Sequence, residues 1–324
     1  MNPEANNLLT VLYARRAHAS VNELAAAANL SLAAAAKALD GLRARGVVLE
    51  ESPSGVRLRR PVNLDAHLIE HGLGTRRVGR NAIVFGEVES TSDVALASSR
   101  QAGADGLAVL AEAQRAGRGR LGRRWVSPAG ANVLMSVLLL DEPARLSGEA
   151  LTIAAGLAVA EAVERTVPAA VTPTLKWPND VLIDDAKVCG ILVEVRRHPR
   201  RAVVVGVGMN VNGAPPPETL TRPATCLSDH AQGPLERIDL VRSVLQRLDA
   251  WVEQITDGDA AAVTRRLHDQ WVTRCGMINQ RVTVRCGGER FVGRVLDIDP
   301  LEGLILQTDS GQQIRLPAAT SSVE

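Results

Sequence analysis

Residues 117–123 read Gly-Arg-Gly-Arg-Leu-Gly-Arg, a stretch that places three arginines among three glycines. The guanidinium group of arginine is permanently charged, and its N–H donors can form paired hydrogen bonds with the oxygens of a phosphate or carboxylate. Glycine lets the backbone approach a ligand closely and adopt positive φ without steric cost. The stretch therefore predicts a loop that holds a polyanion. Taken alone, a solvated basic turn is the alternative interpretation.

The glycine spacing of this loop, Gly117-x-Gly119-x-x-Gly122, also matches the dinucleotide-binding fingerprint, and Asp141 follows 19 residues later. That fingerprint requires a helix to begin at the glycines, so that its N-terminus faces the pyrophosphate. Here the residues 125–128, Trp-Val-Ser-Pro, and then an apolar strand follow the loop. The sequence thus argues against a dinucleotide fold, and arginine side chains must meet the anion.

A second group of charges lies in Lys176-Trp177-Pro178-Asn179-Asp180 and in Lys187-Val188-Cys189-Gly190. Pro-Asn-Asp is common turn chemistry, so a plain turn is one interpretation of the first segment. Lys176 and Lys187 bracket Asp180 beside strands that read as buried, where an unpaired charge is costly and usually serves a ligand. Together with the arginine loop, this group indicates chemistry on a nucleotide phosphate.

Three further patterns have both a structural and a functional interpretation. Residues 90–93, Ser-Thr-Ser-Asp, precede an apolar helix near Val94, so we expect them to cap that helix, a role compatible with ligand contact. Residues 206–212, GVGMNVN, read as a strand that packs closely against a helix or forms a wall for a flat ligand. His67 and His71 have a metal-like spacing without a third ligand, and we expect a solvated linker helix there.

The composition excludes several classes of protein. The 324 residues hold 37 basic and 36 acidic side chains, so no global field attracts nucleic acid or membrane. Aromatic residues make up 2%, too few for the stacking platforms of single-strand-binding proteins. No apolar run reaches the length of a membrane helix, and neither a GxSxG nor a P-loop motif occurs. The cysteines at 189, 226, 275 and 286 form no CxxC pair, which indicates reduced thiols in a cytoplasmic protein.

Apolar periodicity predicts a helix-turn-helix with a small β-wing in residues 1–65. Its helices are expected at 8–16, 21–29 and 32–45, and its strands at 47–49 and 55–58. Ser20 and Ser31 are placed to cap the second and third helices, and Glu23 completes a capping box with Ser20. Residues 66–82 follow as a linker, within a stretch that reads as a short helix and a flexible joint.

The rest of the chain predicts two further domains. Residues 83–275 mix strands with long helices, which predicts an α+β domain with a mixed sheet. Residues 276–324 hold short strands at close spacing, typical of a small β-barrel. The expected strands are 83–88, 107–112, 132–140, 188–195, 202–211, 281–286, 290–297, 304–308 and 312–316, and the expected helices are 147–166 and 235–255.

The charged motifs resemble those of biotin protein ligases. The resemblance rests on residues 114–125 (QRAGRGRLGRRW), on residues 176–180 (KWPND) and on residues 187–194 (KVCGILVE). It implies a catalytic domain with a class II aminoacyl-tRNA-synthetase-like fold, followed by an SH3-like barrel. One branch of that family adds an N-terminal winged helix that represses biotin genes. The three parts drawn from periodicity agree with this arrangement.

The resemblance implies a reaction in two steps. The carboxylate of biotin attacks the α-phosphate of ATP to give biotinyl-5'-AMP and pyrophosphate, with Mg²⁺ sharing the charge of the triphosphate. A lysine of the biotin carboxyl carrier protein of acetyl-CoA carboxylase then takes the biotin. Fixed cations offset the repulsion between the carboxylate and the triphosphate. Asp180 is the candidate to orient or deprotonate the acceptor lysine.

The family pattern also implies a role for each candidate residue. The implied catalytic residues are Arg118, Arg120, Asp180 and Lys187. Biotin is expected to contact Ser90, Thr91, Ser92, Gln114, Gly117, Arg118, Lys187, Gly190 and Gly208. ATP and its phosphates are expected to contact Arg120, Arg123, Trp125, Lys176, Asn179 and Asn210. No residue is assigned to a protein-bound metal, and the loop 117–125 is expected to become ordered over the ligand.

Two departures from the family pattern bear on the partners. Residues 212–229 lack the tryptophan that the regulatory branch often stacks on adenine. The helix that begins at Leu32 has few side chains able to read base edges, while residues 1–60 carry a net charge of +3. Contact with the backbone of operator DNA, through Ser31, Lys37, Arg43 and Arg57, is therefore favoured over sequence-specific reading. The sequence leaves open whether the chain forms a homodimer.

Two alternative functions also stay open. A lipoate or octanoate ligase shares the fold, although the arginine loop, the KWPND segment and the C-terminal barrel together favour biotin. A transcription factor that only senses biotin would need neither the paired lysines nor Asp180.

Overall fold

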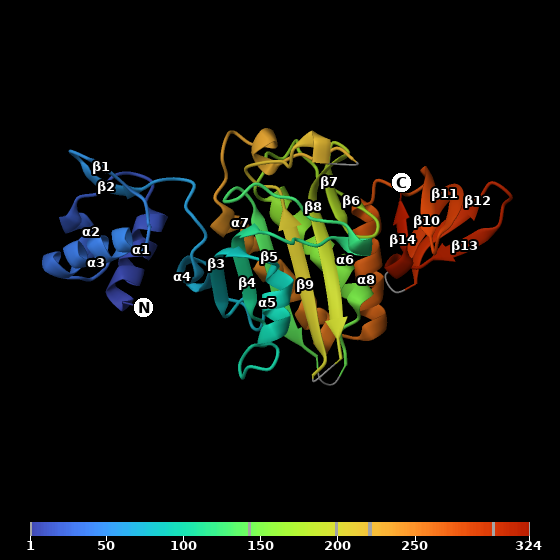
Figure 1. Cartoon of the computed structure of the whole chain (residues 1–324), viewed down its shortest axis with the longest axis horizontal. Coiled ribbons are helices and arrows are strands. Elements are labelled where there is room, and N and C mark those ends of the chain that lie inside the picture. The colour runs from blue at the N-terminus through green and yellow to red at the C-terminus, as the bar shows by residue number, and fades with distance from the viewer. Residues whose placement is uncertain (1, 142–143, 198–199, 220–221, 300–301, 324) are drawn as a thin grey trace.

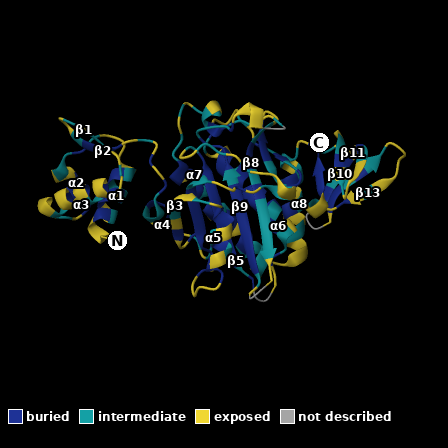
Figure 2. Ribbon diagram, viewed as in Figure 1, coloured by how far each residue is buried: buried dark blue, intermediate teal, exposed yellow. Residues whose placement is uncertain are grey.

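The structure is a computed structural model that describes residues 2–141, 144–197, 200–219, 222–299 and 302–323. Figure 1 shows a small helical N-terminal part, a large central part built around a sheet, and a C-terminal sheet, arranged along one axis. The central part lies between the other two and holds the largest share of buried residues (Figure 2).

The N-terminal part consists of three helices and a β-hairpin. Its elements are α1 (Pro3–Ala14), α2 (Val21–Ala27), α3 (Leu32–Ala44), β1 (Leu49–Ser52) and β2 (Gly55–Leu58). Ser20 forms the predicted capping box with Glu23, and Ser31 caps α3. Helix α1 begins earlier than predicted, because the side chain of Asn2 caps it and a proline suits its first turn.

Hydrogen bonds fix the joint between the N-terminal and central parts, so the expectation of a flexible segment is wrong. The buried carboxylate of Asp249 accepts hydrogen bonds from the backbone N–H groups of residues 76, 77 and 78 at 2.7–2.9 Å. Arg242 donates to the backbone carbonyls of residues 68, 69, 71 and 72. Helix α4 (Ala66–Glu70) is packed rather than solvated, since His67 is half-buried and lies 2.9 Å from the hydroxyl of Thr10.

The central part is built on a seven-stranded mixed sheet with the order β3-β4-β5-β9-β8-β7-β6. Its strands are β3 (Ala82–Val88), β4 (Ala108–Gln114), β5 (Val133–Leu140), β6 (Thr174–Lys176), β7 (Asp180–Ile183), β8 (Ala186–Arg196) and β9 (Ala202–Met209). Strands β3 and β4 pair in parallel, and the other neighbours pair antiparallel. The sequence predicts this mixed sheet but not β6 and β7. These two strands are too short to show an alternating pattern of apolar residues.

Different helices cover the two faces of this sheet. Alternate side chains of a strand point to opposite faces, and on β5 the residues 133, 135, 137 and 139 join the large apolar core that includes α6 (Gly148–Glu164) and α7 (Arg237–Asp257). Leu138 instead joins a smaller core with Ala95 of α5 (Thr91–Ser98). Helix α8 (Ala260–Arg274) is absent from the prediction because only Leu267 and Trp271 of it are buried.

The C-terminal part is a five-stranded antiparallel sheet with the order β13-β12-β11-β10-β14. Its strands are β10 (Arg281–Cys286), β11 (Glu289–Asp299), β12 (Gly303–Thr308), β13 (Gln313–Leu316) and β14 (Ser321–Val323). The first four strands are the predicted ones. Strand β14 is not predicted, and it returns the chain to the central part, where Arg120 donates a hydrogen bond to the carbonyl of Ser321 at 3.1 Å.

Candidate functional site

A cavity of about 480 Å³ lies where β8 and β9 of the central sheet meet the arginine loop and the β6–β7 turn. A cavity of this size suits a small ligand. Fourteen of the predicted site residues line it, namely Ser90, Thr91, Ser92, Gln114, Arg118, Arg120, Arg123, Trp125, Asn179, Asp180, Lys187, Gly190, Gly208 and Asn210. The structure therefore brings together residues from five separate stretches of the sequence.

Two predicted residues, Gly117 and Lys176, are not part of the cavity wall. Gly117 positions the loop instead, because its carbonyl accepts the N–H of Trp125 at 2.9 Å and a Cβ at Gly117 would lie 2.7 Å from the carbonyl oxygen of Trp125. Lys176 stands opposite Asp180 in the β6–β7 register but forms no ion pair with it. Burial, reinforced by the charge of Arg222, lowers the pKa of the Lys176 ammonium group.

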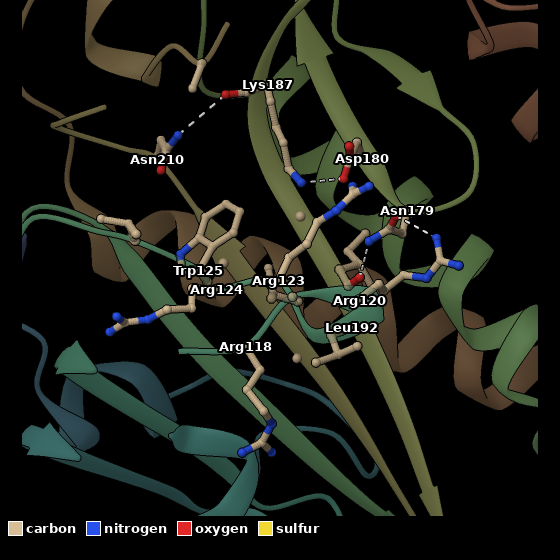
Figure 3. Close-up of a pocket in the computed structure, with 18 of the residues that line it drawn as sticks. Arg118, Arg120, Arg123, Arg124, Trp125, Asn179, Asp180, Lys187, Leu192 and Asn210 are labelled. Atoms are coloured by element: carbon tan, nitrogen blue, oxygen red, sulfur yellow. Dashed lines mark hydrogen bonds and ion pairs between the residues drawn. The ribbon is translucent and has the colours of Figure 1, made fainter. Parts of the chain in front are cut away.

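Lys187 and Asp180 form the central ion pair of the cavity. The Nζ atom of Lys187 lies 2.6 Å from Oδ1 of Asp180, and the two side chains are 31% and 19% exposed. Adjacent strands hold them, Lys187 on β8 and Asp180 at the first position of β7 (Figure 3). This pairing restrains the ammonium group and engages one of its three donors.

The wall of the cavity carries a marked excess of positive charge. Its cations are Arg118, Arg120, Arg123, Arg124, Lys187 and Arg222, and Asp180 is the one carboxylate among the described lining residues. Burial lowers the pKa of the Arg120 guanidinium, so this charge is poorly solvated in the absence of an anion. The cavity is thus built to receive a ligand with several negative charges.

Arg120 also joins the central part to the C-terminal sheet. Its guanidinium donates to the side-chain oxygen of Asn179 at 3.3 Å, to the carbonyl of Ser321 at 3.1 Å and to the carbonyl of Ala318. A 3₁₀ turn (Arg120–Gly122) holds it at the tip of the loop. The hydrogen bonds of Arg120 to residues 318 and 321 show that the C-terminal part helps to fix a cation of the cavity.

Three more 3₁₀ turns lie at Pro217–Thr219, Leu227–His230 and Ala318–Thr320.

Arg118 points away from the Lys187–Asp180 pair (Figure 3). Its guanidinium donates to Asp93 at 2.7 Å and to Glu194 at 3.1 Å, and the hydrogen bond to Asp93 raises its pKa further. Arg118 lines the cavity, yet in this conformation two carboxylates already neutralise its charge. Its expected contact with phosphate or biotin requires the side chain to leave these partners.

The indole of Trp125 covers a floor made by two glycines. A Cβ at Gly208 would lie 2.5 Å from the indole, and a Cβ at Gly190 would lie 2.9 Å from it. Nζ of Lys187 lies 5.4 Å from the ring centroid, within the range of a cation–π contact. The indole Nε1–H is buried without a partner among the described residues. In this conformation the indole lies against the GVGMNVN strand, and the contact of a flat ligand with that strand stays a prediction.

A cluster of hydroxyl and amide groups forms another part of the cavity wall. The hydroxyl of Thr91 lies 2.8 Å from that of Ser136, and Ser92 lies 3.1 Å from the same Ser136 hydroxyl. The backbone N–H of Thr91 donates to the side chain of Gln114 at 2.8 Å. The prediction that residues 90–93 cap a helix beginning near Val94 is wrong in its position, because α5 begins at Thr91. Ser90 is the N-cap residue, but its side chain makes no capping hydrogen bond. These groups face the cavity instead.

The two asparagines of the wall are fixed by backbone carbonyls. Asn179 donates to the carbonyl of Ile191 at 2.6 Å, and Asn210 donates to that of Thr225 at 3.1 Å. The Oδ1 atom of Asn210 is buried and has no partner in the described structure. Buried acceptors usually have a partner, so this oxygen of a cavity-lining residue is a candidate to meet a donor on a ligand.

Several lining residues are absent from the sequence-based prediction. They include Ser136, Leu192, Val207, Arg222, Ser322 and Val323. The sequence around Ser136 could have indicated a functional role, because Ser136 carries the lone hydroxyl of the buried strand VLMSVLLL. No local pattern marks Ser322 and Val323, since only the return of β14 to the central part brings them to the cavity.

The four residues predicted to contact DNA lie in the N-terminal part. Ser31 is occupied as the cap of α3. Arg43 pairs with Asp40 at 2.7 Å and with Glu51 at 2.5 Å, and Arg57 pairs with Glu50 at 2.6 Å. Lys37 is exposed on α3 and takes part in no ion pair within the described chain. Internal carboxylates therefore neutralise two of the three predicted cations.

Among the described residues, no group of three or more His, Cys, Asp or Glu could hold a metal ion. In the same part of the chain, no helix has the length and apolar character needed to cross a membrane. All four cysteines are free thiols, and burial raises the pKa of Cys189.

Two segments of the chain match known protein families. Residues 85–210 match the Biotin/lipoate A/B protein ligase family, and residues 277–320 match the biotin protein ligase C terminal domain. The chain is 30% identical to "Bifunctional ligase/repressor BirA" of Bacillus subtilis, over 85% of each chain. It is 36% identical to "Biotin--[acetyl-CoA-carboxylase] ligase" of Mycobacterium tuberculosis, over 75% of this chain and 89% of the relative.

A solved structure shares the fold of most of the chain. The biotin protein ligase from Aquifex aeolicus in complex with biotin and ATP aligns with a TM-score of 0.64 and 26% identity, covering 76% of this chain and 99% of the other.

Proposed function

The chain belongs to the biotin protein ligase family, and we propose that it joins biotin to AMP and then passes the biotin to a lysine of a biotin carboxyl carrier protein. The observation that carries this proposal is the cavity, whose described wall residues include six cationic side chains and one carboxylate. A carboxylate and a triphosphate repel each other, and fixed cations in a partly buried site offset that repulsion.

In the first step, a carboxylate oxygen of biotin attacks the α-phosphorus of ATP. A new oxygen–phosphorus bond forms, and the bond to the β-phosphate breaks and releases pyrophosphate. Lys187 is the cation nearest the reacting groups in this proposal, because Asp180 already holds its ammonium group in place. Arg120 and Arg123 bind the phosphates. Arg120 gains most from an anion, since its charge is buried.

Biotin needs a dry slot with polar groups at the ureido end. The cluster of Thr91, Ser92, Ser136 and Gln114 supplies donors and acceptors from buried or half-buried side chains. A ligand in the cavity contacts the indole of Trp125 or takes its place on the glycine floor. We therefore place the ureido ring at the hydroxyl cluster and the carboxylate toward Lys187.

In the second step, the amine of the acceptor lysine attacks the acyl carbon of the adenylate. A carbon–nitrogen bond forms, the bond from the acyl carbon to the phosphate oxygen breaks, and AMP leaves. A free lysine has a pKa of about 10.4 and must lose a proton before it attacks. Asp180 is the carboxylate of the wall, so it accepts a hydrogen bond from the incoming ammonium group and guides its proton toward solvent.

The described residues fit Mg²⁺ only as a companion of the triphosphate. Within the described part of the chain, Asp180 is the single carboxylate of the wall, and no cluster of three ligands occurs. Mg²⁺ is usually held by one or two carboxylates together with substrate phosphates and water. When bound with ATP, the ion would neutralise part of the phosphate charge that the arginines share.

The domain limits 1–65, 66–82, 83–275 and 276–324 remain our proposal. We propose a winged helix for the first domain, because a β-hairpin follows three helices. A class II synthetase-like fold is proposed for the catalytic domain and an SH3-like barrel for the C-terminal sheet. A repressor role, in which residues 1–65 contact operator DNA, is proposed from this domain and from the name of the Bacillus subtilis relative.

Internal pairing of Arg43 and Arg57 limits the DNA contact that we propose to nonspecific backbone binding through groups such as Lys37. A cytoplasmic location fits the four free thiols. A homodimer is proposed from the family resemblance alone.

Biotin-dependent exchange of labelled pyrophosphate into ATP tests the proposed function. The purified full chain should catalyse this exchange with biotin and should not catalyse it with lipoate or octanoate. If no exchange occurs with biotin, a transcription factor that only senses biotin would explain the chain better than a ligase. Equal exchange with lipoate would assign the chain to the lipoyl branch of the fold.

A further inference from the structure

Asn132 is a buried polar residue at the point where the chain enters the apolar strand β5. It is only 1% exposed. Its side-chain Nδ2 donates to the hydroxyl of Ser127 and to the carbonyl of Gly213, both at 2.9 Å. Its Oδ1 accepts the backbone N–H of Val211 at 2.8 Å. Both N–H donors of the amide and its oxygen are therefore engaged.

These bonds join two segments that carry residues of the cavity wall. Ser127 follows closely after Trp125, whose indole covers the glycine floor. Val211 directly follows Asn210, and Figure 3 shows the side chains of Trp125 and Asn210 at the same cavity. Asn132 itself is not among the described lining residues. It therefore acts on the cavity only through the segments that it joins.

The central part holds Asn132 in place from the other side. The guanidinium of Arg237, which is 2% exposed, donates to the backbone carbonyl of Asn132 at 3.2 Å. The same guanidinium pairs with Glu112 of β4, and the backbone carbonyl of Glu112 accepts the N–H of Gly130 at 2.9 Å. The backbone of residues 130–132 is thus fixed to the sheet and gives the side-chain amide a rigid base.

The two joined segments approach each other closely. A Cβ at Gly213 would lie 3.4 Å from Cβ of Ala131 and 3.5 Å from Cγ of Pro128. The N–H of Asn212 donates to the carbonyl of Ala131 at 3.0 Å. A buried amide adds little net stability, because its bonds to water are exchanged for bonds within the protein. Its directional bonds instead specify one arrangement of the groups that it joins.

We propose that Asn132 is a positioning residue for the formation of the adenylate, an inference that rests on the ligase function proposed above. It fixes the C-terminal end of the arginine loop against the segment that follows β9. Without this link, the free chain samples more arrangements of the cavity wall. Biotin and ATP bind the fraction of molecules whose wall is correctly arranged, so a smaller fraction weakens the apparent affinity and leaves the rate of the bound complex unchanged.

The kinetics of biotin-dependent pyrophosphate exchange test this role, with the full chain and a range of biotin and ATP concentrations. Asn132→Ala removes all three side-chain hydrogen bonds. Ser127→Ala removes one of them from a half-buried position outside the cavity wall, so it does not threaten the fold.

Asp249→Ala is the matched control. Asp249 is 6% exposed and also makes three hydrogen bonds, to the backbone of residues 76–78. Neither Asp249 nor these partners belong to the described wall of the cavity. The control therefore removes as many buried bonds as Asn132→Ala without touching the segments that carry the wall.

We expect Asn132→Ala to raise the KM for biotin and the KM for ATP about tenfold and to keep kcat within about twofold of the wild type. Ser127→Ala should raise both KM values about threefold. It should add nothing in the Asn132→Ala background, because the bond that it removes is already absent there. Asp249→Ala should lower the melting temperature and leave both KM values unchanged.

Unchanged KM values in Asn132→Ala would overturn the proposal, and so would effects of the two substitutions that multiply in the double variant. If Asn132→Ala does not fold, Ser127→Ala decides, since an unchanged KM in that variant contradicts the link and a raised KM supports it. Failure of the ligase function itself is a separate result, because the wild-type chain would then show no exchange.

Discussion

Replacement of Asp180 by asparagine separates the two proposed steps. The amide has nearly the shape of the carboxylate, so Asp180→Asn keeps the β6–β7 turn and removes only the charge. In the wild type, that charge lies 2.6 Å from Nζ of Lys187, and the Asp180 side chain is 19% exposed. The variant therefore frees Lys187 to meet the anionic substrates but leaves the incoming lysine without a proton acceptor.

The size of the effect follows from the kind of bond that is lost. A hydrogen bond to a charged group contributes about 1.5–3 kcal/mol, which corresponds to a fall of about 10- to 150-fold in the rate of transfer. Adenylate formation should fall by less than transfer does, because losing the carboxylate loosens the position of Lys187 but leaves its charge and the arginines in the cavity. The two steps should thus respond differently to the same substitution.

Single-turnover kinetics measure this difference. The adenylate is formed first from biotin and ATP, the carrier domain is then added, and the rate of labelling is compared with the rate of pyrophosphate exchange. Asp184→Asn is the matched control, since Asp184 is 87% exposed in the turn between β7 and β8. Equal losses in exchange and transfer, or no loss of transfer, would refute the role assigned to Asp180.

Three further substitutions test other contacts. Arg120→Ala should lower pyrophosphate exchange about tenfold or more and lower the melting temperature, because one cation serves both the phosphates and the C-terminal sheet; unchanged exchange would contradict this. Asp249→Ala leaves three backbone N–H groups of residues 76–78 without an acceptor, so calorimetry should show a melting temperature lower by roughly 5–10 °C, and a shift near zero would contradict the fixed joint. Burial alone would lower the pKa of His268, but hydrogen bonds to Asp297 and Asp269 raise it overall. The protonated histidine therefore stabilises the fold below a pH of about 6.5 and loses this effect as the pH rises through its folded pKa, so the melting-temperature gap between wild type and His268→Gln should be wide at low pH and close at high pH.

Local patterns in the sequence predict much of the fold. The strand VLMSVLLL, the capping box at Ser20 and the four strands from 281 to 316 lie where they are expected, because each depends on neighbouring residues. The arginine loop and Lys187 are predicted from charge type and spacing, since few structural roles need so many cations beside glycines.

Contacts between distant segments are the part that the sequence does not predict. Nothing local to Asp249 indicates that it binds the backbone of residues 76–78, or that Arg118 pairs with Asp93 and Glu194. The position of Trp125 on the glycine floor depends on how the loop folds back over β8 and β9. Short elements such as β6, β7 and β14 are stabilised by their sheet partners and carry too few residues to show a period.

The central claim is that the cationic cavity makes biotinyl-5'-AMP and gives its acyl group to one lysine. Intact-mass spectrometry of a carrier domain, incubated with the full chain, biotin, ATP and Mg²⁺, tests this claim most directly. We predict the addition of a single biotin that requires ATP and disappears when the acceptor lysine of the carrier is replaced by arginine. A carrier of unchanged mass, or one modified equally well without ATP, would contradict the account.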